Sequence, residues 1–310
     1  MKTVFIDGSA GTTGLRIRER LAVRTDLSLI ALPEDKRKDI HARREALNSA
    51  DVAFLCLPDD AAREAVTLIE NPKTAVIDTS TAHRTASGWA YGFPELFGKR
   101  AEIATSKRIA NPGCHASGFI ALVAPLVRAR LLSESALLTA FSLTGYLGGG
   151  KKMIAEYESA ERPAALDAPR QYALGQAHKH LPEMKAVCGI EHAPVFSPIV
   201  ADYYAGMEVT VPLFAEMLKG TRDDVIDVYR EAYRTGLVRY NAEMGEGGLL
   251  CGAAFSGRDD MELGVLGNEE RILLVARYDN LGKGASGAAI QNMNILLGAD
   301  ERAGLVIGEK

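Results

Sequence analysis

The 310-residue chain lacks paired cysteines, long apolar runs and a large net charge, and each absence excludes a class of protein. Its four cysteines are scattered and form no CxxC pair, which argues against a disulfide framework or a structural zinc site and fits a reducing cytosol. No apolar run approaches the length of a membrane span, and a charge and a glycine come too early for a signal peptide. The formal net charge of −4 gives no general attraction to nucleic acid or to an anionic membrane. We therefore expect a cytoplasmic protein with a small-molecule substrate, and the length suits two globular domains.

A glycine-rich turn near the start of the chain has the context of a dinucleotide-binding loop. Residues 3–6 favour a β-strand, the sequence DGSAGTTG follows, and residues 15–21 carry apolar side chains at helical spacing. Glycine lets the backbone turn sharply and approach a pyrophosphate, whose charge then meets the amides at the start of the helix. The alternative is a glycine turn that binds no ligand. The candidate cofactor-binding residues, in GxxGxxG spacing, are Gly8, Gly11, Thr12, Thr13 and Gly14.

Apolar strands and helices alternate over about the first 110 residues. Strand-like runs at residues 26–32, 51–58 and 74–80 are separated by helical patterns such as that of residues 59–69. Near-continuous apolar strands that alternate with helices are typical of a parallel sheet buried on both faces. The pattern predicts an α/β domain with a doubly wound sheet.

The residues after the second predicted strand bear on the identity of the cofactor. A site that prefers NAD usually places Asp or Glu there for the ribose 2′-hydroxyl, and Glu34 and Asp35 come slightly late for that role. The basic run Lys36, Arg37 and Lys38 follows, and such a run can hold the 2′-phosphate of NADP. A charge run can also be an ordinary solvated loop. We favour NADP as the cofactor, with Arg37 as a binding residue, and keep NAD bound through Glu34 or Asp35 as the alternative.

One cysteine has the setting of a nucleophile. Cys114 follows a turn made by Pro112 and Gly113, and an apolar helical pattern begins behind it. A thiol at a helix N-terminus meets aligned amides and the positive end of the helix dipole, which stabilise a thiolate. The commoner fate of a cysteine is that of a small buried apolar residue, and Cys56 in an apolar strand fits that description. The turn and the neighbour His115 favour the nucleophile for Cys114.

A thiol nucleophile needs a proton-transfer partner, and the sequence GQAHKHLPEM offers two imidazoles. His178 and His180 share a face if the segment is extended and are separated if it is helical. One can act as the acid/base and the other can hold an anion, with Glu183 orienting an imidazole. The alternatives are two solvated loop histidines, or a metal site that uses Cys114 or His115. We expect no metal, because no paired-cysteine or HExxH spacing is present.

Together these motifs resemble those of N-acetyl-γ-glutamyl-phosphate reductase, in its shorter form, and more distantly those of aspartate-semialdehyde dehydrogenase. The resemblance runs nearly end to end. The segment IDTSTAHR departs from the D-x-S-A-D-F-R pattern of the longer form. The matching segments are GSAGTTG, IDTSTAHR, YGFPEL, ANPGCHASG, HKHLPE and DNLGKGASGAAIQNMN.

The resemblance implies a fold, an oligomer and further site residues. A Rossmann NADP-binding domain of residues 1–113 and 285–310 is expected, with an α+β catalytic and dimerisation domain of residues 114–284. Strand-like runs at residues 202–213 and 270–280 suit a sheet in that second domain, which in relatives forms a dimer face, so we expect a homodimer or homotetramer. The residues implied are Arg84, His180 and Glu183 for substrate, and Ser80, Asn280 and Gly284 for cofactor.

The reaction implied is reduction of N-acetyl-L-glutamyl 5-phosphate to the 5-semialdehyde in arginine biosynthesis. Cys114 is the expected nucleophile that forms a thioester, and His178 is the expected acid/base. Arg84 can instead make an ordinary ion pair. Two other functions remain open: another acyl-phosphate reductase such as aspartate-semialdehyde dehydrogenase, and a non-catalytic NADP-binding redox sensor that has no need of His178.

Overall fold

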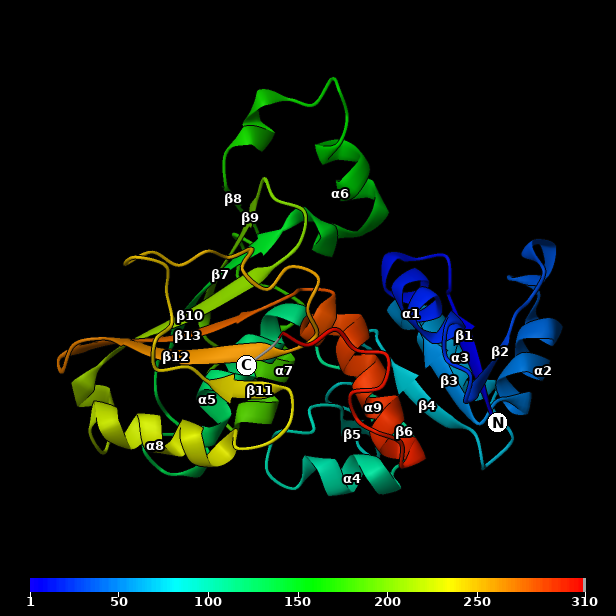
Figure 1. Ribbon diagram of the computed structural model, residues 1–310, viewed down its shortest axis with the longest axis horizontal. Coiled ribbons are helices and arrows are strands. Elements are labelled where there is room, and N and C mark those ends of the chain that lie inside the picture. The colour runs from blue at the N-terminus through cyan, green and yellow to red at the C-terminus, as the bar shows by residue number, and fades with distance from the viewer. Residues whose placement is uncertain (309–310) are drawn as a thin grey trace. The chain divides into compact units, whose positions relative to one another are not determined.

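The computed structural model describes residues 1–308 and divides into two compact units (Figure 1). The chain passes from unit 1 to unit 2 at Cys114 and returns at Ala285. The segments of unit 1 are Met1–Pro94, Gly98–Gly113 and Ala285–Leu305, and those of unit 2 are Glu95–Phe97, Cys114–Gly284 and residues 306–308.

Two short segments differ from the predicted domain boundaries. Glu95–Phe97 groups with unit 2, because the Glu95 carboxylate accepts a hydrogen bond from the Leu237 amide and binds the Lys283 ammonium. Residues 306–308 group with unit 2 as well, because the Val306 backbone exchanges hydrogen bonds with Asp259. The sequence assigned both segments to the nucleotide-binding domain.

Unit 1 contains a six-stranded sheet in the order β2-β1-β3-β4-β6-β5, and each neighbouring pair is parallel. Three strands, β2, β3 and β4, fall inside the predicted runs, and β1 extends one residue beyond its run at each end. The sequence analysis did not predict β5 and β6. The prediction of a parallel sheet is confirmed. The strands are β1 (Lys2–Asp7), β2 (Leu27–Ile30), β3 (Val52–Leu55), β4 (Ala75–Asp78), β5 (Ala90–Tyr91) and β6 (Arg108–Ala110).

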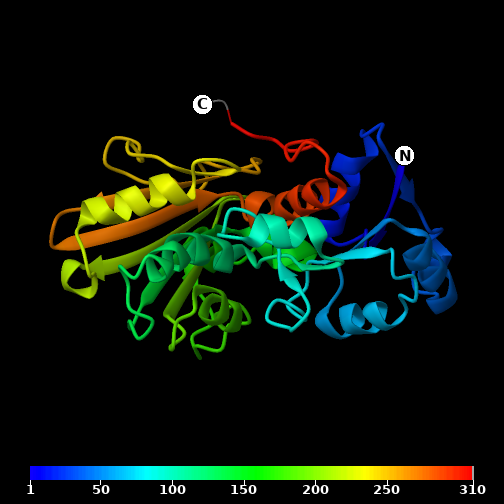
Figure 2. The same cartoon turned by 90° about the horizontal axis from the view of Figure 1, so that it is seen from below.

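Helices cover both faces of this sheet. Ile17 and Ile290 pack into one buried cluster with Val4 on one face, and Leu47 and Phe5 belong to a separate cluster on the other. Side chains alternate along each strand, so a strand such as β1 supplies apolar residues to both clusters. Figure 2 shows α9 lying beside α1 within this unit. The helices are α1 (Thr12–Ala22), α2 (Ile40–Ser49), α3 (Asp59–Thr67), α4 (Lys99–Thr105) and α9 (Gly287–Leu297), with the short 3₁₀ helix η1 (Glu34–Lys36).

Unit 2 contains a mixed seven-stranded sheet in the order β11-β12-β13-β10-β7-β9-β8. Residues 202–206, part of the run predicted as a strand, form a turn instead, because Gly206 adopts a φ of +115° before β10 begins. The strands are β7 (Thr139–Gly145), β8 (Arg170–Gln171), β9 (Val195–Ala201), β10 (Met207–Phe214), β11 (Val238–Tyr240), β12 (Met261–Gly267) and β13 (Arg271–Tyr278).

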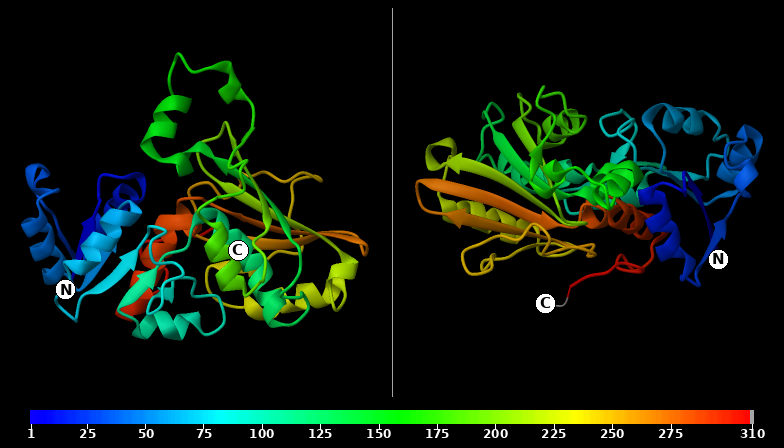
Figure 3. Two further views of the ribbon diagram at one scale, coloured as in Figure 1. Left: turned by 180° about the vertical axis from the view of Figure 1, so that it is seen from behind. Right: turned by 90° about the horizontal axis from the view of Figure 1, so that it is seen from above.

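One face of this sheet packs on helices. The helix α5 (Cys114–Arg128) lies against β10 and β13, and α7 (Leu181–Cys188) and α8 (Arg222–Ala232) pack beside it. The segment that contains η2 (Tyr146–Gly149), α6 (Gly150–Tyr157) and η3 (Ala164–Asp167) extends away from the sheet beyond β8 and β9 (Figure 3, left). Two further short helices are the 3₁₀ helix η4 (Ala215–Met217) and the π-helix η5 (Gly282–Ser286).

The opposite face of the sheet carries exposed apolar side chains. Along β10 the helix-facing Val211 is fully buried, whereas Phe214 on the alternate face is 62% exposed. Phe141 and Val195 on β7 and β9, and Leu273 on β13, are exposed as well. A sheet with one covered face and one exposed apolar face is suited to pairing with another surface.

Proline inside α5 is accommodated by two tyrosines. Pro125 has no N–H, so the carbonyl of Ala121 one turn earlier loses its helical partner. The hydroxyl of Tyr233 donates to the Ala121 oxygen and that of Tyr229 to the Leu122 oxygen, both at 2.6 Å. These bonds satisfy the buried carbonyls and tie α5 to α8.

No helix among residues 1–308 combines the length and the apolarity that crossing a membrane requires.

Candidate active site

Cys114 is the first residue of α5, where the sequence predicts it. The preceding Asn111 is fixed by its backbone amide, which donates to the Asp78 carbonyl at 2.7 Å at the end of β4. The Cys114 side chain is partly exposed, unlike that of Cys188, whose thiol is buried and whose pKa burial raises. Of these two thiols, Cys114 is the one in a position to meet a substrate.

The end of β13 and the π-helix η5 pack against Cys114. The hydroxyl of Tyr278 donates to the Cys114 carbonyl at 2.6 Å. A Cβ atom added to Gly284 would lie 3.1 Å from the Cys114 Cβ, so a glycine at this position leaves room for the cysteine. Single-turn π-helices are often found at functional sites.

Three imidazoles gather in unit 2. The ring centroids of His178 and His180 lie 4.7 Å apart, and both lie within 5.6 Å of the His115 ring centroid. The segment that carries them is neither an extended strand nor a helix but a turn that leads into α7. The turn brings the rings together, which the extended alternative predicted and the helical one did not.

The His178 tautomer follows from one hydrogen bond. The His180 backbone amide donates to His178 Nδ1 at 3.2 Å. A nitrogen that accepts a hydrogen bond carries no proton, so a neutral His178 holds its proton on Nε2. His178 is partly exposed and His180 is buried, which makes His178 the more accessible imidazole.

The turn before His178 is fixed by the Gln176 side chain, which makes two hydrogen bonds with the backbone of β9. The Gln176 amide donates to the Phe196 carbonyl and accepts from the Phe196 amide, both at 2.8 Å. Ala173 and Gln176 adopt positive φ values of 52° and 53°, which costs conformational energy in residues with a side chain. The two hydrogen bonds to β9 offset that cost and fix the turn that leads to His178.

His115 is a buried residue with a partner at each ring nitrogen. Its Nδ1 lies 2.7 Å from the Ser142 hydroxyl and its Nε2 lies 2.6 Å from the Tyr172 hydroxyl. Burial, with smaller contributions from the charges of His178 and Lys179, lowers the pKa of His115 to about 3. The imidazole is therefore neutral near pH 7, so it donates to one hydroxyl and accepts from the other.

Tyr172 lies beside His115 and His178. Its ring centroid is 5.9 Å from that of His178. Burial raises the pKa of Tyr172, and the charge of Cys114 adds to the effect. The phenol therefore stays protonated near neutral pH.

Replacing His115 by glutamine should change the pH dependence of stability. In the wild type the folded imidazole stays neutral while the unfolded one takes up a proton below about pH 6.5, so stability falls as the pH drops from there toward about 3. Within that window His115 should contribute a slope of about 1.4 kcal/mol per pH unit, which His115→Gln should remove. Urea denaturation between about pH 6 and 4 measures the slope. The exposed His192→Gln should keep the wild-type slope, and identical slopes in all three proteins would contradict the assignment.

Glu183 lies in the first turn of α7, and its side chain is buried. It follows the two histidines within the same turn-to-helix segment, so the structure places all three predicted residues in one local unit. Its role toward an imidazole or the substrate stays a prediction.

A buried ion pair supports η5. Lys283 Nζ lies 2.9 and 2.7 Å from the two carboxylate oxygens of Glu95, and both side chains are almost completely buried. A buried charge that loses its partner is strongly destabilising. The pair therefore fixes η5, including Gly284, next to Cys114. The sequence analysis named Glu95 only within the YGFPEL segment and assigned it no role.

Asn280 is also buried in unit 2. Its amide donates to Thr144 Oγ1 at 3.2 Å and to the Gly145 carbonyl at 3.3 Å, and it accepts from the Gly206 amide at 3.2 Å. These bonds join the ends of β7, β10 and β13. Cofactor binding by Asn280 stays a prediction, as it does for Gly284.

In unit 1 the glycine loop borders a pocket of about 660 Å³. Gly8 has a φ of +86°, and a Cβ there would overlap the Cys56 carbonyl oxygen. A Cβ on Gly14 would come within 2.5 Å of the Gly8 oxygen, so two of the three glycines are required by close packing. Gly11 is exposed, and Thr12 and Thr13 begin α1 with partly exposed side chains.

The far side of the pocket has mixed charge. Arg37 and Lys38 line it together with Glu34 and Asp35, whereas Lys36 lies outside the lining. Arg37 is 3.9 Å from the Glu34 carboxylate. This end of the pocket therefore offers both basic groups for a 2′-phosphate and acidic groups for a ribose 2′-hydroxyl. Arg18 of α1 also lines the pocket, which the sequence analysis did not anticipate.

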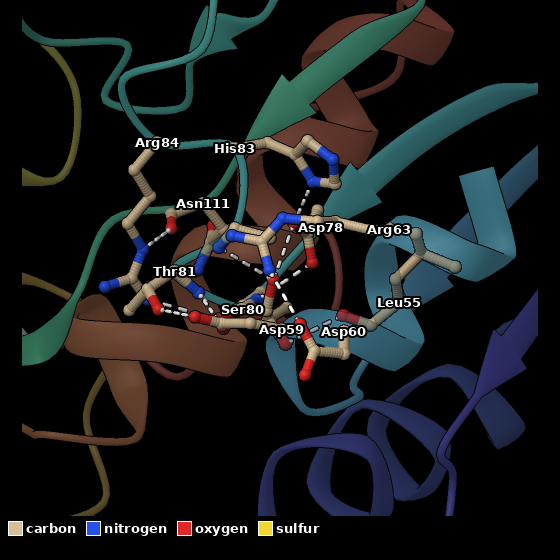
Figure 4. A network of polar contacts seen from close by, with 12 residues as sticks. Leu55, Asp59, Asp60, Arg63, Asp78, Ser80, Thr81, His83, Arg84 and Asn111 are labelled. Carbon is tan, nitrogen blue, oxygen red and sulfur yellow. Dashed lines mark hydrogen bonds and ion pairs between the residues drawn. The ribbon is translucent and has the colours of Figure 1, made fainter. Parts of the chain in front are cut away.

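Ser80 and its neighbours form a polar network at the end of β4 (Figure 4). The Asp78 carboxylate accepts from the Ser80 amide at 2.9 Å and hydroxyl at 2.8 Å, and from His83 Nδ1 at 2.6 Å. His83 also stacks on Trp89 with a centroid separation of 4.0 Å. Ser80 is thus buried in a fixed turn, and its cofactor role stays a prediction.

Arg84 extends from the same network. Its Nε donates to the Asn111 carbonyl at 2.9 Å and its Nη2 to the Thr79 carbonyl at 3.1 Å (Figure 4). The contacts join the turn after β4 to the segment that leads to Cys114. Substrate binding by Arg84 stays a prediction.

Metal ligation at this site finds no geometric support from His115, because both its ring nitrogens meet protein hydroxyls. Within residues 1–308 no cluster of three or more His, Cys, Asp or Glu side chains is arranged to hold a metal ion.

Family models match both units. Residues 3–105 match the NAD binding domain of semialdehyde dehydrogenase, and residues 114–280 match its dimerisation domain. The second model alone covers more than half of the chain.

Relatives of known name match nearly the whole length. The chain is 46% identical over 306 residues to N-acetyl-gamma-glutamyl-phosphate reductase 2 of Pseudomonas putida, covering 96% of this chain and 97% of the relative. It is 45% identical over 306 residues to N-acetyl-gamma-glutamyl-phosphate reductase of Rhizobium meliloti, covering 96% and 99%.

Solved structures share the fold. Aspartate semialdehyde dehydrogenase II of Vibrio cholerae, solved in complex with ASA, matches with a TM-score of 0.70 at 16% identity over 96% of this chain and 98% of its own. The enzyme of Francisella tularensis matches with a TM-score of 0.71 at 13% identity over 96% and 100%. The predicted two-part α/β fold and the predicted resemblance are confirmed: the chain belongs to the semialdehyde dehydrogenase family and, within it, to the N-acetyl-gamma-glutamyl-phosphate reductases.

Proposed function

We propose that the chain reduces N-acetyl-L-glutamyl 5-phosphate to N-acetyl-L-glutamate 5-semialdehyde, a step of arginine biosynthesis. The observation that carries the proposal is Cys114 at the start of α5 beside a cluster of three imidazoles, in a chain 46% identical to a reductase of that name. Acyl-phosphate reduction needs a nucleophile and a proton-transfer group in one place, and unit 2 supplies both.

Cys114 begins the reaction as a thiolate. Its sulfur attacks the carbonyl carbon of the acyl phosphate, the carbon–oxygen bond to phosphate breaks, and inorganic phosphate leaves with the electron pair. The product on the enzyme is a thioester. Sulfur donates weakly into the carbonyl, so the thioester carbon remains electrophilic.

When bound, a nicotinamide cofactor would supply the hydride that reduces the thioester. His178 acts at the thiohemiacetal that results on Cys114, where its Nε2 gives and takes the proton of the substrate oxygen. When the carbon–sulfur bond breaks, the aldehyde carbonyl re-forms and the electron pair returns to sulfur.

We assign substrate binding to three further side chains. His180 holds the phosphate, and Glu183 orients an imidazole. Arg84 contributes a guanidinium for the substrate phosphate or carboxylate.

NADP is the cofactor that we propose for the pocket of unit 1. The Gly8 turn, which lines the pocket and precedes α1, is of the type that holds a pyrophosphate, and the volume of about 660 Å³ suits a dinucleotide portion. Arg37 and Lys38 can pair with the 2′-phosphate. Hydride transfer to the thioester is the chemistry that the cofactor supplies.

A steady-state assay in the oxidative direction tests the function. N-acetyl-L-glutamate 5-semialdehyde, inorganic phosphate and NADP⁺ should give phosphate-dependent formation of NADPH. Aspartate semialdehyde in its place should be a poor substrate. Equal or better use of aspartate semialdehyde would favour the alternative dehydrogenase, and no turnover with either would favour the redox sensor.

The ratio of kcat/KM for NADPH over NADH tests the cofactor preference. It should exceed one in the wild type and should fall about tenfold or more in Arg37→Ala, because a charge-assisted hydrogen bond contributes roughly 1.5–3 kcal/mol. Lys36→Ala is the matched control, since Lys36 does not line the pocket. A wild-type ratio below one would instead support NAD bound through Glu34 or Asp35.

Oligomer formation is expected of the dimerisation domain, and we place the contact on the exposed apolar face of the unit 2 sheet. Phe141, Phe214 and Leu273 would be buried by pairing of two copies. Sedimentation equilibrium separates a homodimer from a homotetramer.

A further inference from the structure

Tyr278 occupies an unusual place in the first turn of the helix that carries the nucleophile. Its side chain is completely buried at the end of β13. The hydroxyl donates to the Cys114 carbonyl at 2.6 Å and accepts from the Gly118 amide at 3.0 Å. Cys114 and Gly118 are four residues apart, so the Tyr278 oxygen bridges the two groups that an α-helix pairs directly.

Gly118 makes this arrangement possible. A Cβ at that position would lie 2.7 Å from the Tyr278 hydroxyl oxygen and 2.7 Å from a methyl of Val209. An alanine would therefore push against the hydroxyl on one side and β10 on the other. The helix has a glycine where the tyrosine oxygen enters the first turn.

The other tyrosines that bond to α5 have a different purpose. Tyr233 and Tyr229 donate to carbonyls near Pro125, which lacks the N–H that would otherwise pair with one of them. Cys114 and Gly118 have no such defect, because Gly118 has an amide to offer. The bond from Tyr233 therefore satisfies a carbonyl that has no partner within the helix. The bond from Tyr278 to the Cys114 carbonyl has no such explanation.

The residues after Tyr278 also hold the region around Cys114. The Asp279 carboxylate accepts from the Leu281 and Gly282 amides, both at 2.7 Å, and the Gly284 amide donates to the Asp279 carbonyl at 3.0 Å. Gly284 then lies against the Cys114 side chain. One continuous segment therefore contacts the cysteine through both its carbonyl and its Cβ.

We propose that Tyr278 is a positioning residue for the nucleophile: its hydroxyl fixes the Cys114 carbonyl and the first turn of α5, and so sets the direction of the sulfur. The inference rests on the proposed function, in which that sulfur attacks the acyl carbon. The hydroxyl does not itself take part in proton transfer, since both of its hydrogen bonds go to the backbone.

Tyr278→Phe tests the inference. Because misplacement of a reacting group by about 1 Å can cost about 100-fold in rate, kcat should fall about 10- to 100-fold, while KM for the substrate changes less than about threefold. The rate of Cys114 alkylation by iodoacetamide, which needs neither substrate nor cofactor, should fall at least about fivefold, because a displaced first turn moves the sulfur away from the helix N-terminal amides that stabilise a thiolate.

Tyr233→Phe is the matched control. It removes a hydroxyl-to-carbonyl bond of the same 2.6 Å length from the same helix, so its loss of thermal stability should be comparable. Its kcat and alkylation rate should stay within about twofold of the wild type, because the affected carbonyl is two turns away from Cys114. Gly118→Ala, which keeps the hydroxyl but displaces it, should reproduce the kinetic loss if Tyr278→Phe does not fold.

The outcomes distinguish the positioning role of Tyr278 from the proposed reductase activity. Equal kcat and equal alkylation rates in Tyr278→Phe and Tyr233→Phe would overturn the positioning role. A wild type that lacks reductase activity but shows the alkylation difference would overturn the proposed function and retain the positioning of the thiol.

Discussion

Cys114→Ser is expected to lower kcat by roughly 1,000-fold or more, because a serine alkoxide is not accessible near neutral pH and Cys114 is the thiol that we propose forms the thioester. NADPH binding should be unchanged, since the pocket that fits the cofactor is lined entirely by unit 1 residues. Steady-state rates with the 5-semialdehyde and phosphate measure the first effect, and fluorescence titration of NADPH measures the second.

Iodoacetamide provides a companion measurement. It should inactivate the wild type rapidly, and substrate should slow the inactivation. Cys251→Ser is the matched control, because Cys251 is exposed and lies in a loop that the proposed chemistry does not use, so its activity should equal that of the wild type. Retention of most activity in Cys114→Ser, or inactivation that requires Cys251, would remove the nucleophile assignment.

His178→Asn should give the second large effect. General acid–base catalysis contributes roughly 100- to 10,000-fold, so kcat should fall within that range and one limb of the pH–rate profile should flatten. His178 is favoured over His180 because its proton lies on Nε2 and its ring is partly exposed. The exposed His192→Asn should leave both the rate and the profile unchanged.

The neighbouring histidine defines the contrary outcome. His180 is buried at the start of α7, and its amide holds the His178 ring. If His180→Asn flattens the profile and His178→Asn leaves it nearly unchanged, the two roles are reversed.

Local sequence was sufficient where the signal was local. The Pro-Gly turn before Cys114 and the apolar residues behind it predicted the start of α5, because both act within a few residues of the helix end. The glycine spacing predicted the turn after β1 for the same reason. The parallel sheet followed from apolar strands that alternate with helices.

The partners of His115 could not be predicted in this way. Ser142 and Tyr172 are 27 and 57 residues away along the chain, and the contacts depend on how β7, β9 and α5 pack together. His115 was considered only as a neighbour of the thiol or as a metal ligand. Its burial, which keeps it neutral, is a property of the folded unit and not of the sequence around it.

The conformation of residues 178–180 was also beyond local reasoning. Spacing distinguished a strand from a helix, but the segment is a turn whose shape depends on Gln176 in a left-handed conformation and on its bonds to Phe196. The basic run was resolved only in part. Lys36 is the last residue of η1 and does not line the pocket, whereas Arg37 and Lys38, which follow η1, do.

The bond from Tyr278 to Cys114 has a consequence for how the protein is made. The two residues are 164 positions apart, so at the usual translation rate of roughly 5–20 residues per second the nucleophile leaves the ribosome about 8 to 33 s before its tyrosine. During that time the first turn of α5 lacks the hydroxyl that bridges it. The orientation of the sulfur that we propose for catalysis can therefore form only after Tyr278 has been synthesised, late in the production of the chain.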